Sequence, residues 1–169
     1  ADGYDVGLGK KAQIEGDVDA TNDVSLEPEA QIKSSADGKN FVLRRKSQIE
    51  GDVDASGNVT VKQKSQIKGS VDGTDIILEK KAQVANSIDA AGNVSVGKEA
   101  QAKGDVDAVG NVSLGKEAQI KGAVTAGGNV SLGENAQIEG DVDAGGNVSI
   151  AEGAEIKGSI TAGGSVSRA

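Results

Sequence analysis

Apolar and small residues occur in pairs two positions apart, and these pairs recur every six residues along the chain. Between residues 111 and 128 the pairs are Val112 with Leu114, Ala118 with Ile120, and Val124 with Ala126. Alternate residues of a β-strand point to the same side, so each pair predicts a short strand with one inward face. Three such strands, separated by corners, make one coil of triangular cross-section.

The coil repeats every eighteen residues, as the segments GNVSLGKEAQIKG from Gly110 and GNVSLGENAQIEG from Gly128 illustrate. Two spacings are 17 residues, where a corner is one residue shorter. The first inward positions are Val6, Val24, Phe41, Val59, Ile76, Val94, Val112, Val130, Val148 and Val166. The sequence therefore predicts an all-β fold: a single-stranded triangular β-solenoid of nine coils, each with three short parallel strands. It spans residues 1–169 as one domain, with a partial tenth coil from residue 165.

Glycine recurs at one corner of the predicted coil, at Gly16, Gly51, Gly69, Gly104, Gly122, Gly140 and Gly158. Asn86 replaces it in one coil, and Asn also tolerates positive φ. We therefore expect a tight corner with positive φ at this position.

The composition fits a thin core and excludes several classes of function. Tyr4 and Phe41 are the only aromatic residues, and 36% of the chain is hydrophobic, so large side chains that fill a compact core are missing. A net charge of -8 argues against binding to nucleic acid or to an anionic membrane surface. No apolar run is long enough to insert into a membrane.

Residues that carry most enzymatic chemistry are absent. The sequence contains no His and no Cys, which excludes Cys-His and Ser-His-Asp nucleophiles and the usual zinc ligands. We therefore predict a protein that is not an enzyme, with no catalytic residue and no bound cofactor.

The segments GDVDASGNVTV, GDVDAVGNVSLGKEAQIKG and GDVDAGGNVSIAEGAEIKG resemble the bactofilin pattern, and the resemblance covers nearly the whole chain. It implies a right-handed triangular β-helix that polymerises end to end without nucleotide and acts as a scaffold. The coil is also similar to left-handed hexapeptide-repeat proteins, so the residues leave the handedness open. Bactofilins typically carry disordered, often proline-rich tails, whereas Pro28 is the only proline here. We therefore expect an extracellular or cell-surface filament, with a cytoplasmic bacterial cytoskeleton as the alternative.

The outward positions form columns along the predicted rod. A glutamine column starts at Gln13 and Gln31, and stacked amides are expected to hydrogen-bond along the axis. A neighbouring column alternates in sign, as at Glu15 and Lys33, which favours correct register. The acidic positions are weak candidates for Ca²⁺ ligands, at Asp17, Asp19, Asp52, Asp54, Asp105, Asp107, Asp141 and Asp143. A solvated acidic face is the preferred interpretation, and a rod that binds cations or a ligand along these Asp and Gln columns is the alternative function.

The two ends of the predicted rod have neither a polar cap nor a covering helix, so strand edges and core residues are expected to be exposed there. The predicted polymer interface consists of Val6, Leu8, Ile14 and Val18 at one end and Val148, Ile150, Ile156, Ile160 and Val166 at the other. Pairing of unlike ends gives an open head-to-tail filament of identical subunits. Nine coils plus one side predict a rotation of about a third of a turn per subunit. The sequence thus predicts a self-assembling structural subunit whose partner is itself.

Overall fold

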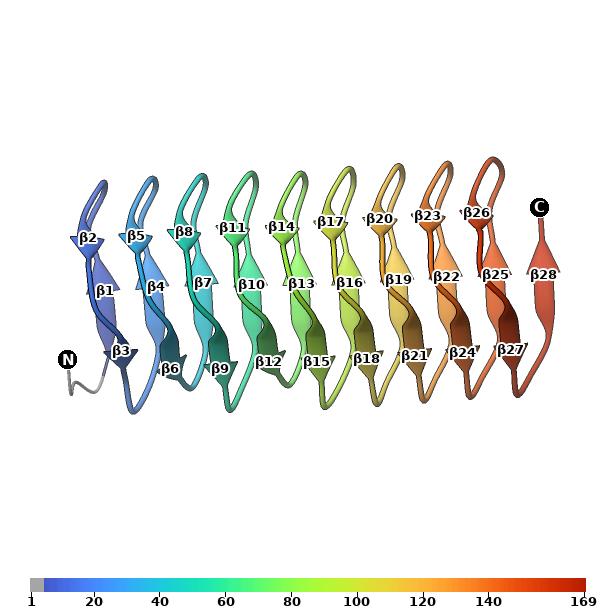
Figure 1. Ribbon diagram of the computed structural model, residues 1–169, viewed down its shortest axis with the longest axis horizontal. Helices are drawn as coiled ribbons and strands as arrows, with labels where there is room; N and C mark the ends of the chain where they lie inside the picture. The colour runs from blue at the N-terminus through green and yellow to red at the C-terminus, as the bar shows by residue number, and fades with distance from the viewer. Residues whose placement is uncertain (1–4) are drawn as a thin grey trace.

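The computed structural model describes residues 5–169, which leaves Tyr4 outside the described part of the chain. These residues form 28 short strands, arranged as three parallel sheets along a rod (Figure 1). The first sheet contains β1 (Val6–Leu8), β4 (Val24–Leu26), β7 (Phe41–Leu43), β10 (Val59–Val61), β13 (Ile76–Leu78), β16 (Val94–Val96), β19 (Val112–Leu114), β22 (Val130–Leu132), β25 (Val148–Ile150) and β28 (Val166–Arg168).

The other two sheets contain nine strands each. The second sheet contains β2 (Gln13–Ile14), β5 (Gln31–Ile32), β8 (Gln48–Ile49), β11 (Gln66–Ile67), β14 (Gln83–Val84), β17 (Gln101–Ala102), β20 (Gln119–Ile120), β23 (Gln137–Ile138) and β26 (Glu155–Ile156). The third sheet contains β3 (Val18–Asp19), β6 (Ala36–Gly38), β9 (Val53–Ala55), β12 (Val71–Gly73), β15 (Ile88–Ala90), β18 (Val106–Ala108), β21 (Val124–Ala126), β24 (Val142–Ala144) and β27 (Ile160–Ala162).

The predicted solenoid of about nine coils is confirmed. Each strand pairs in parallel with the equivalent strand of the next coil, as Val112 does with Val130 and Leu114 with Leu132. Inward residues are buried and the residues between them are more exposed, because a strand presents alternate side chains to opposite faces. Among residues 5–169 no helix is long and apolar enough to cross a membrane.

The core is a set of stacked columns of small and branched side chains between the three sheets. Ile67, Ile120 and Ile138 are fully buried, and so are Ala100 and Ala118 of the alanine column. Ser47 and Ser65 interrupt this alanine column as buried polar residues. Their hydroxyls donate to the Arg44 carbonyl oxygen at 2.5 and 2.7 Å, so neither is left without a partner in the core.

The expectation of positive φ at the glycine corner is wrong. Among the described residues, Gly153 is the only glycine with positive φ, and it does not lie at this corner. Asn86, which does lie at the corner, has no positive φ. The left-handed conformation lies instead in the turn between the first and second sheets, at Lys11, Glu29, Lys46, Lys64, Lys81, Glu99, Glu117, Asn135 and Gly153. Seven of the nine coils carry glycine at this corner, where successive coils approach closely, and Ser34 and Asn86 occupy it in the other two. A Cβ at Gly140 would lie 2.5 Å from the Ala123 nitrogen and the Gly122 oxygen.

Candidate functional site

The surfaces with functional potential are the outward columns and the two end coils of the rod. One column, at the corner between the third and first sheets, links each coil to the next through Asn or Asp side chains. The Oδ1 atom of Asn93 accepts the backbone N–H of Asn111 at 2.9 Å, and Asn111 and Asn129 repeat the contact at 2.8 Å. This ladder was not predicted from the sequence, although an Asn or Asp every seventeen or eighteen residues was its signal. The ladder satisfies corner amides that the strands leave free.

The Ca²⁺ candidates divide into two columns with different environments. Asp17, Asp52, Asp105 and Asp141 accept the backbone N–H of the following coil, in three cases at 2.7 Å. The side-chain and backbone hydrogen bonds from Ser34 and Ser35 lower the pKa of Asp17 below its ordinary value. Over residues 5–169 no group of three or more His, Cys, Asp or Glu is arranged to hold a metal ion. The observed role of the corner carboxylates is that of backbone acceptors between successive coils.

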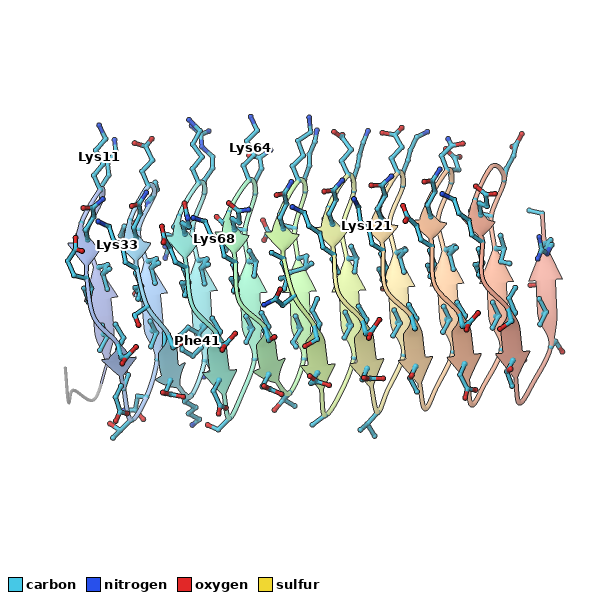
Figure 2. The ribbon with its side chains drawn as sticks, viewed as in Figure 1. Lys11, Lys33, Phe41, Lys64, Lys68 and Lys121 are labelled. Carbon is cyan, nitrogen blue, oxygen red and sulfur yellow. The ribbon has the colours of Figure 1, made fainter. Side chains whose placement is uncertain are left out.

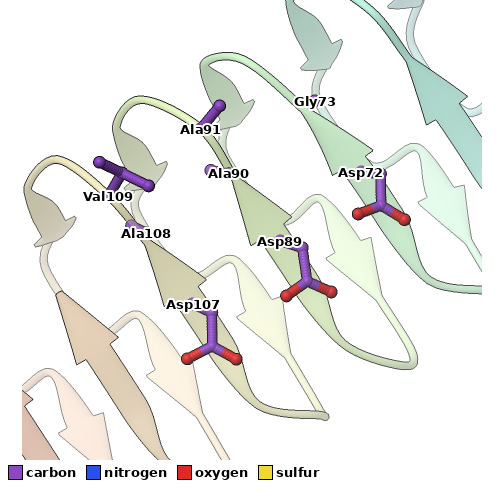
Figure 3. A pocket seen from close by; sticks show the side chains of 8 residues that line it. All are labelled: Asp72, Gly73, Asp89, Ala90, Ala91, Asp107, Ala108 and Val109. Carbon is purple, nitrogen blue, oxygen red and sulfur yellow. The ribbon is translucent and has the colours of Figure 1, made fainter. Parts of the chain in front are cut away.

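Asp19, Asp54, Asp107 and Asp143 belong to the second column, the acidic face of the third sheet. Its other members include Asp72, which lies in register between Asp54 and Asp89. Partial desolvation, followed by the charges of Asp89 and Asp54, raises the pKa of Asp72. Figure 3 shows Asp72, Asp89 and Asp107 along the side of a shallow hollow whose other lining residues are Gly73, Ala90, Ala91, Ala108 and Val109.

Replacing Asp72 with asparagine is expected to stabilise the protein at pH 7 by about 0.2–1 kcal/mol, the magnitude for like charges opposed on adjacent strands. The raised folded-state pKa means that ionised Asp72 opposes folding at neutral pH. This penalty diminishes as the pH falls through the folded-state pKa and is absent below the ordinary Asp value of ~3.9. Urea unfolding at pH 7 and pH 3 measures the difference, which we expect to vanish at the lower pH.

Asp141→Ala is the control with the opposite sign, because hydrogen bonds from Ser159 lower the pKa of Asp141. The stabilisation from Asp141 is present above its ordinary pKa and is lost as the pH falls through the lowered value, so this variant should be less stable at pH 7. An Asp72→Asn variant that is destabilised at pH 7 would contradict the repulsion argument.

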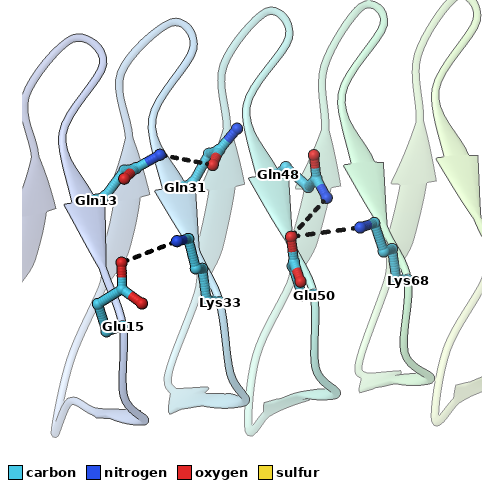
Figure 4. A network of polar contacts seen from close by, with 7 residues as sticks. All are labelled: Gln13, Glu15, Gln31, Lys33, Gln48, Glu50 and Lys68. Atoms are coloured by element: carbon cyan, nitrogen blue, oxygen red, sulfur yellow. Dashed lines mark hydrogen bonds and ion pairs between the residues drawn. The ribbon is translucent and has the colours of Figure 1, made fainter.

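The glutamine and charged columns of the second sheet make contacts along the rod axis (Figure 4). Gln13 donates to Gln31 at 2.9 Å and Gln101 donates to Gln119 at 2.9 Å, which confirms the predicted amide ladder at these steps. Gln48 departs from the ladder and donates to Glu50 in its own coil. The neighbouring charges pair as predicted at two steps, Glu15 with Lys33 at 2.9 Å and Glu50 with Lys68 at 3.3 Å.

The residues predicted as polymer interface differ in their exposure. Leu8, Val18, Val148, Ile150 and Ile156 are buried within the rod, whereas Val6, Ile14 and Ile160 are partly buried and Val166 is 49% exposed. The four less buried residues therefore carry the accessible apolar surface of this set at the end coils. Arg168 was not among the predicted interface residues, although it pairs with Ile150 at an otherwise apolar position.

In the first described coil, backbone N–H groups of the second sheet lack the preceding strand to which later coils donate. In the second sheet, the N–H groups of Gln31 and Lys33 donate to Ala12 and Ile14 of the coil before, at 2.8 and 2.9 Å. The equivalent donors of the first described coil are on Gln13 and Glu15, which have no coil before them within residues 5–169. The described part of the chain thus carries strand edges that a further strand can extend.

Comparison with protein families gives a match to the bactofilin model, described as polymer-forming cytoskeletal, over residues 7–88 and 81–161. The chain belongs to the bactofilin family. Searches of curated proteins and of solved structures found no match. The resemblance read from the sequence is thereby confirmed, and the family description is structural, that of a cytoskeletal polymer. The description fits the cytoplasmic alternative better than the extracellular or cell-surface location, which nothing in the comparisons supports.

Proposed function

We propose that this bactofilin is the repeating subunit of a cytoplasmic cytoskeletal filament in which rods join head to tail. The family match over most of the chain carries the proposal, because it describes a polymer-forming protein. The uniform parallel pairing of successive coils supports end-to-end growth, since an incoming coil can repeat the same hydrogen bonds.

Head-to-tail joining preserves the parallel direction of every strand across the junction. The inward pairs recur every six residues up to Val166 and Arg168, and the first sheet has one strand more than the others. A following subunit therefore fills the stepped end when its β1 stacks on β26, which turns it by about a third of a rotation. Without that turn, β1 and β28 compete for the same place in the first sheet.

Electron microscopy of the purified chain, without nucleotide or metal, tests assembly. The expected result is unbranched filaments that lengthen by end-to-end joining of rods. Rods that stay single at all concentrations would overturn the proposed function. A fluorescent fusion in the cells that produce the protein tests location, and a signal outside the cytoplasm would overturn that part of the proposal.

Cysteine cross-linking tests polarity and rotation, and the chain provides no background because it lacks cysteine. Stacked coils place Cα atoms ~4.8 Å apart, within the ~4.4–6.8 Å range of disulfides. In the turned head-to-tail junction, Gln13 stacks beside Thr161. Mixed Gln13→Cys and Thr161→Cys subunits should therefore form disulfide-linked dimers on oxidation. Dimers from Gln13→Cys alone would overturn head-to-tail polarity, and dimers from Gln13→Cys with Glu155→Cys would overturn the rotation.

Gly16→Ala is expected to raise the critical concentration for assembly about tenfold or more while leaving the stability of the rod unchanged. A Cβ at Gly16 has no atom within 4 Å, whereas the same corner in later coils lies against the preceding coil. In a filament the preceding subunit would occupy the space beside Gly16. A steric clash there would cost ~1–3 kcal/mol, which corresponds to a rise in critical concentration of about tenfold or more. Sedimentation across a concentration series measures the effect.

Gly9→Ala is the matched control for assembly. Gly9 lies in the same coil and also has no atom within 4 Å of an added Cβ, but its column carries Glu27, Arg44 and Lys62 in the next coils. Assembly of Gly9→Ala should equal that of the unmodified chain. Equal critical concentrations for Gly16→Ala and the unmodified chain would contradict the proposed end contact.

A further inference from the structure

A basic edge runs along the turns between the first and second sheets in the third to fifth coils. It consists of Arg44, Arg45, Lys46, Lys62, Lys64, Lys80 and Lys81, and these turns project from the rod at the upper side of Figure 2, where Lys64 is labelled. Four of these side chains are held by Glu27, Glu79 or Glu99. Within residues 5–169, Arg45, Lys46 and Lys64 make no ion pair and are exposed. The edge thus offers positive charge that the rod itself does not neutralise.

The opposite side of the rod is the acidic face of the third sheet. Asp72, Asp89 and Asp107 are exposed there on consecutive coils and have no cationic partner in the described part of the chain. They flank the shallow hollow that also contains Ala91 and Val109. Of the large hydrophobic residues that the structure describes, Val109 is the most exposed, at 72%. Asp72, Asp89, Asp107, Ala91 and Val109 are called the acidic hollow below.

The edge and the hollow are complementary in spacing as well as in charge. Both advance by one coil per charge, so lysines of one rod and aspartates of a second rod have the same separation of ~4.8 Å along the axis. A lysine side chain buries its methylene stem on apolar surface and keeps its ammonium at a polar rim. The alanine and valine side chains of the hollow offer that surface, and the aspartates form the rim.

We propose that the basic edge of one rod docks laterally into the acidic hollow of a second copy, so that filaments associate side by side. In a triangular coil the turn between the first and second sheets lies opposite the third sheet, as Figure 1 shows for the turns above β2 and the strands from β3 to β27. A rod that docks through its edge keeps its own hollow free. The contact is therefore heterologous and extends into an open array of filaments.

A charge-reversal pair tests this contact. Lys46→Glu with Lys64→Glu makes the edge acidic, and glutamate already occupies the same turn position at Glu29, Glu99 and Glu117. Asp89→Lys with Asp107→Lys makes the hollow basic at outward positions, where another coil carries Thr125. Each double variant alone should give single filaments in electron microscopy, with loss of the bundles formed by the unmodified protein. An equimolar mixture of the two variants should restore bundles, because the acidic edge of one fits the basic hollow of the other.

Lys121→Glu with Lys157→Glu is the control. It lowers the net charge by the same amount as Lys46→Glu with Lys64→Glu, but in a different column, which also contains Glu139. This control should bundle like the unmodified protein. Bundles that persist in both double variants, an unmodified protein that forms only single filaments, or a mixture that stays unbundled would overturn the inference. Loss of the filaments themselves would instead count against the proposed function.

Discussion

Replacing Phe41 with alanine is expected to lower the free energy of unfolding by about 3–5 kcal/mol, the usual cost of removing a buried Phe side chain. Phe41 is the largest fully buried side chain, and it is labelled in Figure 2. It stacks in register between Val24 and Val59 of the adjacent coils. The thin core has few large side chains that could move into the space, so a cavity remains. Urea unfolding followed by circular dichroism measures the loss.

The environment of Phe41 explains why the loss should be large. Phe41 follows one of the two shortened corners, and Gly38 stands where most coils carry alanine. A Cβ at Gly38 would lie 2.9 Å from the Val24 side chain and 3.3 Å from the Phe41 ring. The absence of a methyl group at Gly38 therefore leaves the space that the Phe41 ring needs. Val109→Ala is the control, and its 72% exposed side chain should change stability by less than ~0.5 kcal/mol. A loss below about 1 kcal/mol for Phe41→Ala, roughly a third of the expected minimum, would contradict close packing around the ring.

Gly140→Ala is the second substitution with a large expected effect, a destabilisation of about 1–3 kcal/mol. The added Cβ would lie 2.5 Å from backbone atoms of Ala123 and Gly122, which no side-chain rotation relieves. The two coils must separate locally, which weakens hydrogen bonds such as Gly140 N–H to Gly122 oxygen at 3.2 Å. Thermal unfolding of the variant measures the shift.

Gly16→Ala provides a control in the same column, because its added Cβ has no atom within 4 Å. Under conditions that keep the protein monomeric, Gly16→Ala should unfold like the unmodified chain. Equal losses for Gly16→Ala and Gly140→Ala would mean that glycine is required by the corner itself and not by the neighbouring coil.

The period of the coil, the inward columns and the pairing register could be predicted from the sequence. Pairs two apart that recur every six residues leave one arrangement that buries all of them, and a shift by one residue would expose every inward side chain. Val112 and Val130 therefore had to align, as they do. The absence of His and Cys and the resemblance to the family pattern also predicted a structural polymer, which agrees with the family's description.

The reasons behind the corner residues could not be predicted in the same way. Glycine in a repeat suggests positive φ, but the positive φ lies at residues such as Lys46 and Glu99, while Gly140 is required by close contact with another coil. Aspartates in a column suggest a solvated acidic face or, as the weaker alternative, a cation site, and neither interpretation predicts that Asp52 and Asp141 accept backbone N–H groups. Both features depend on the distance between coils.

The sequence by itself thus determined which side chains face inward, how many coils stack and in which register, because hydrophobic burial depends mainly on the periodic order of residue types. Only the tertiary structure decided which polar group each corner residue contacts and which charges remain unpaired, as at Lys46, Lys64 and Asp89. Those outcomes depend on backbone angles and on atoms of neighbouring coils, about eighteen residues away in the sequence. A hydrogen bond forms only when its donor and acceptor atoms lie within a few tenths of an ångström of the preferred distance.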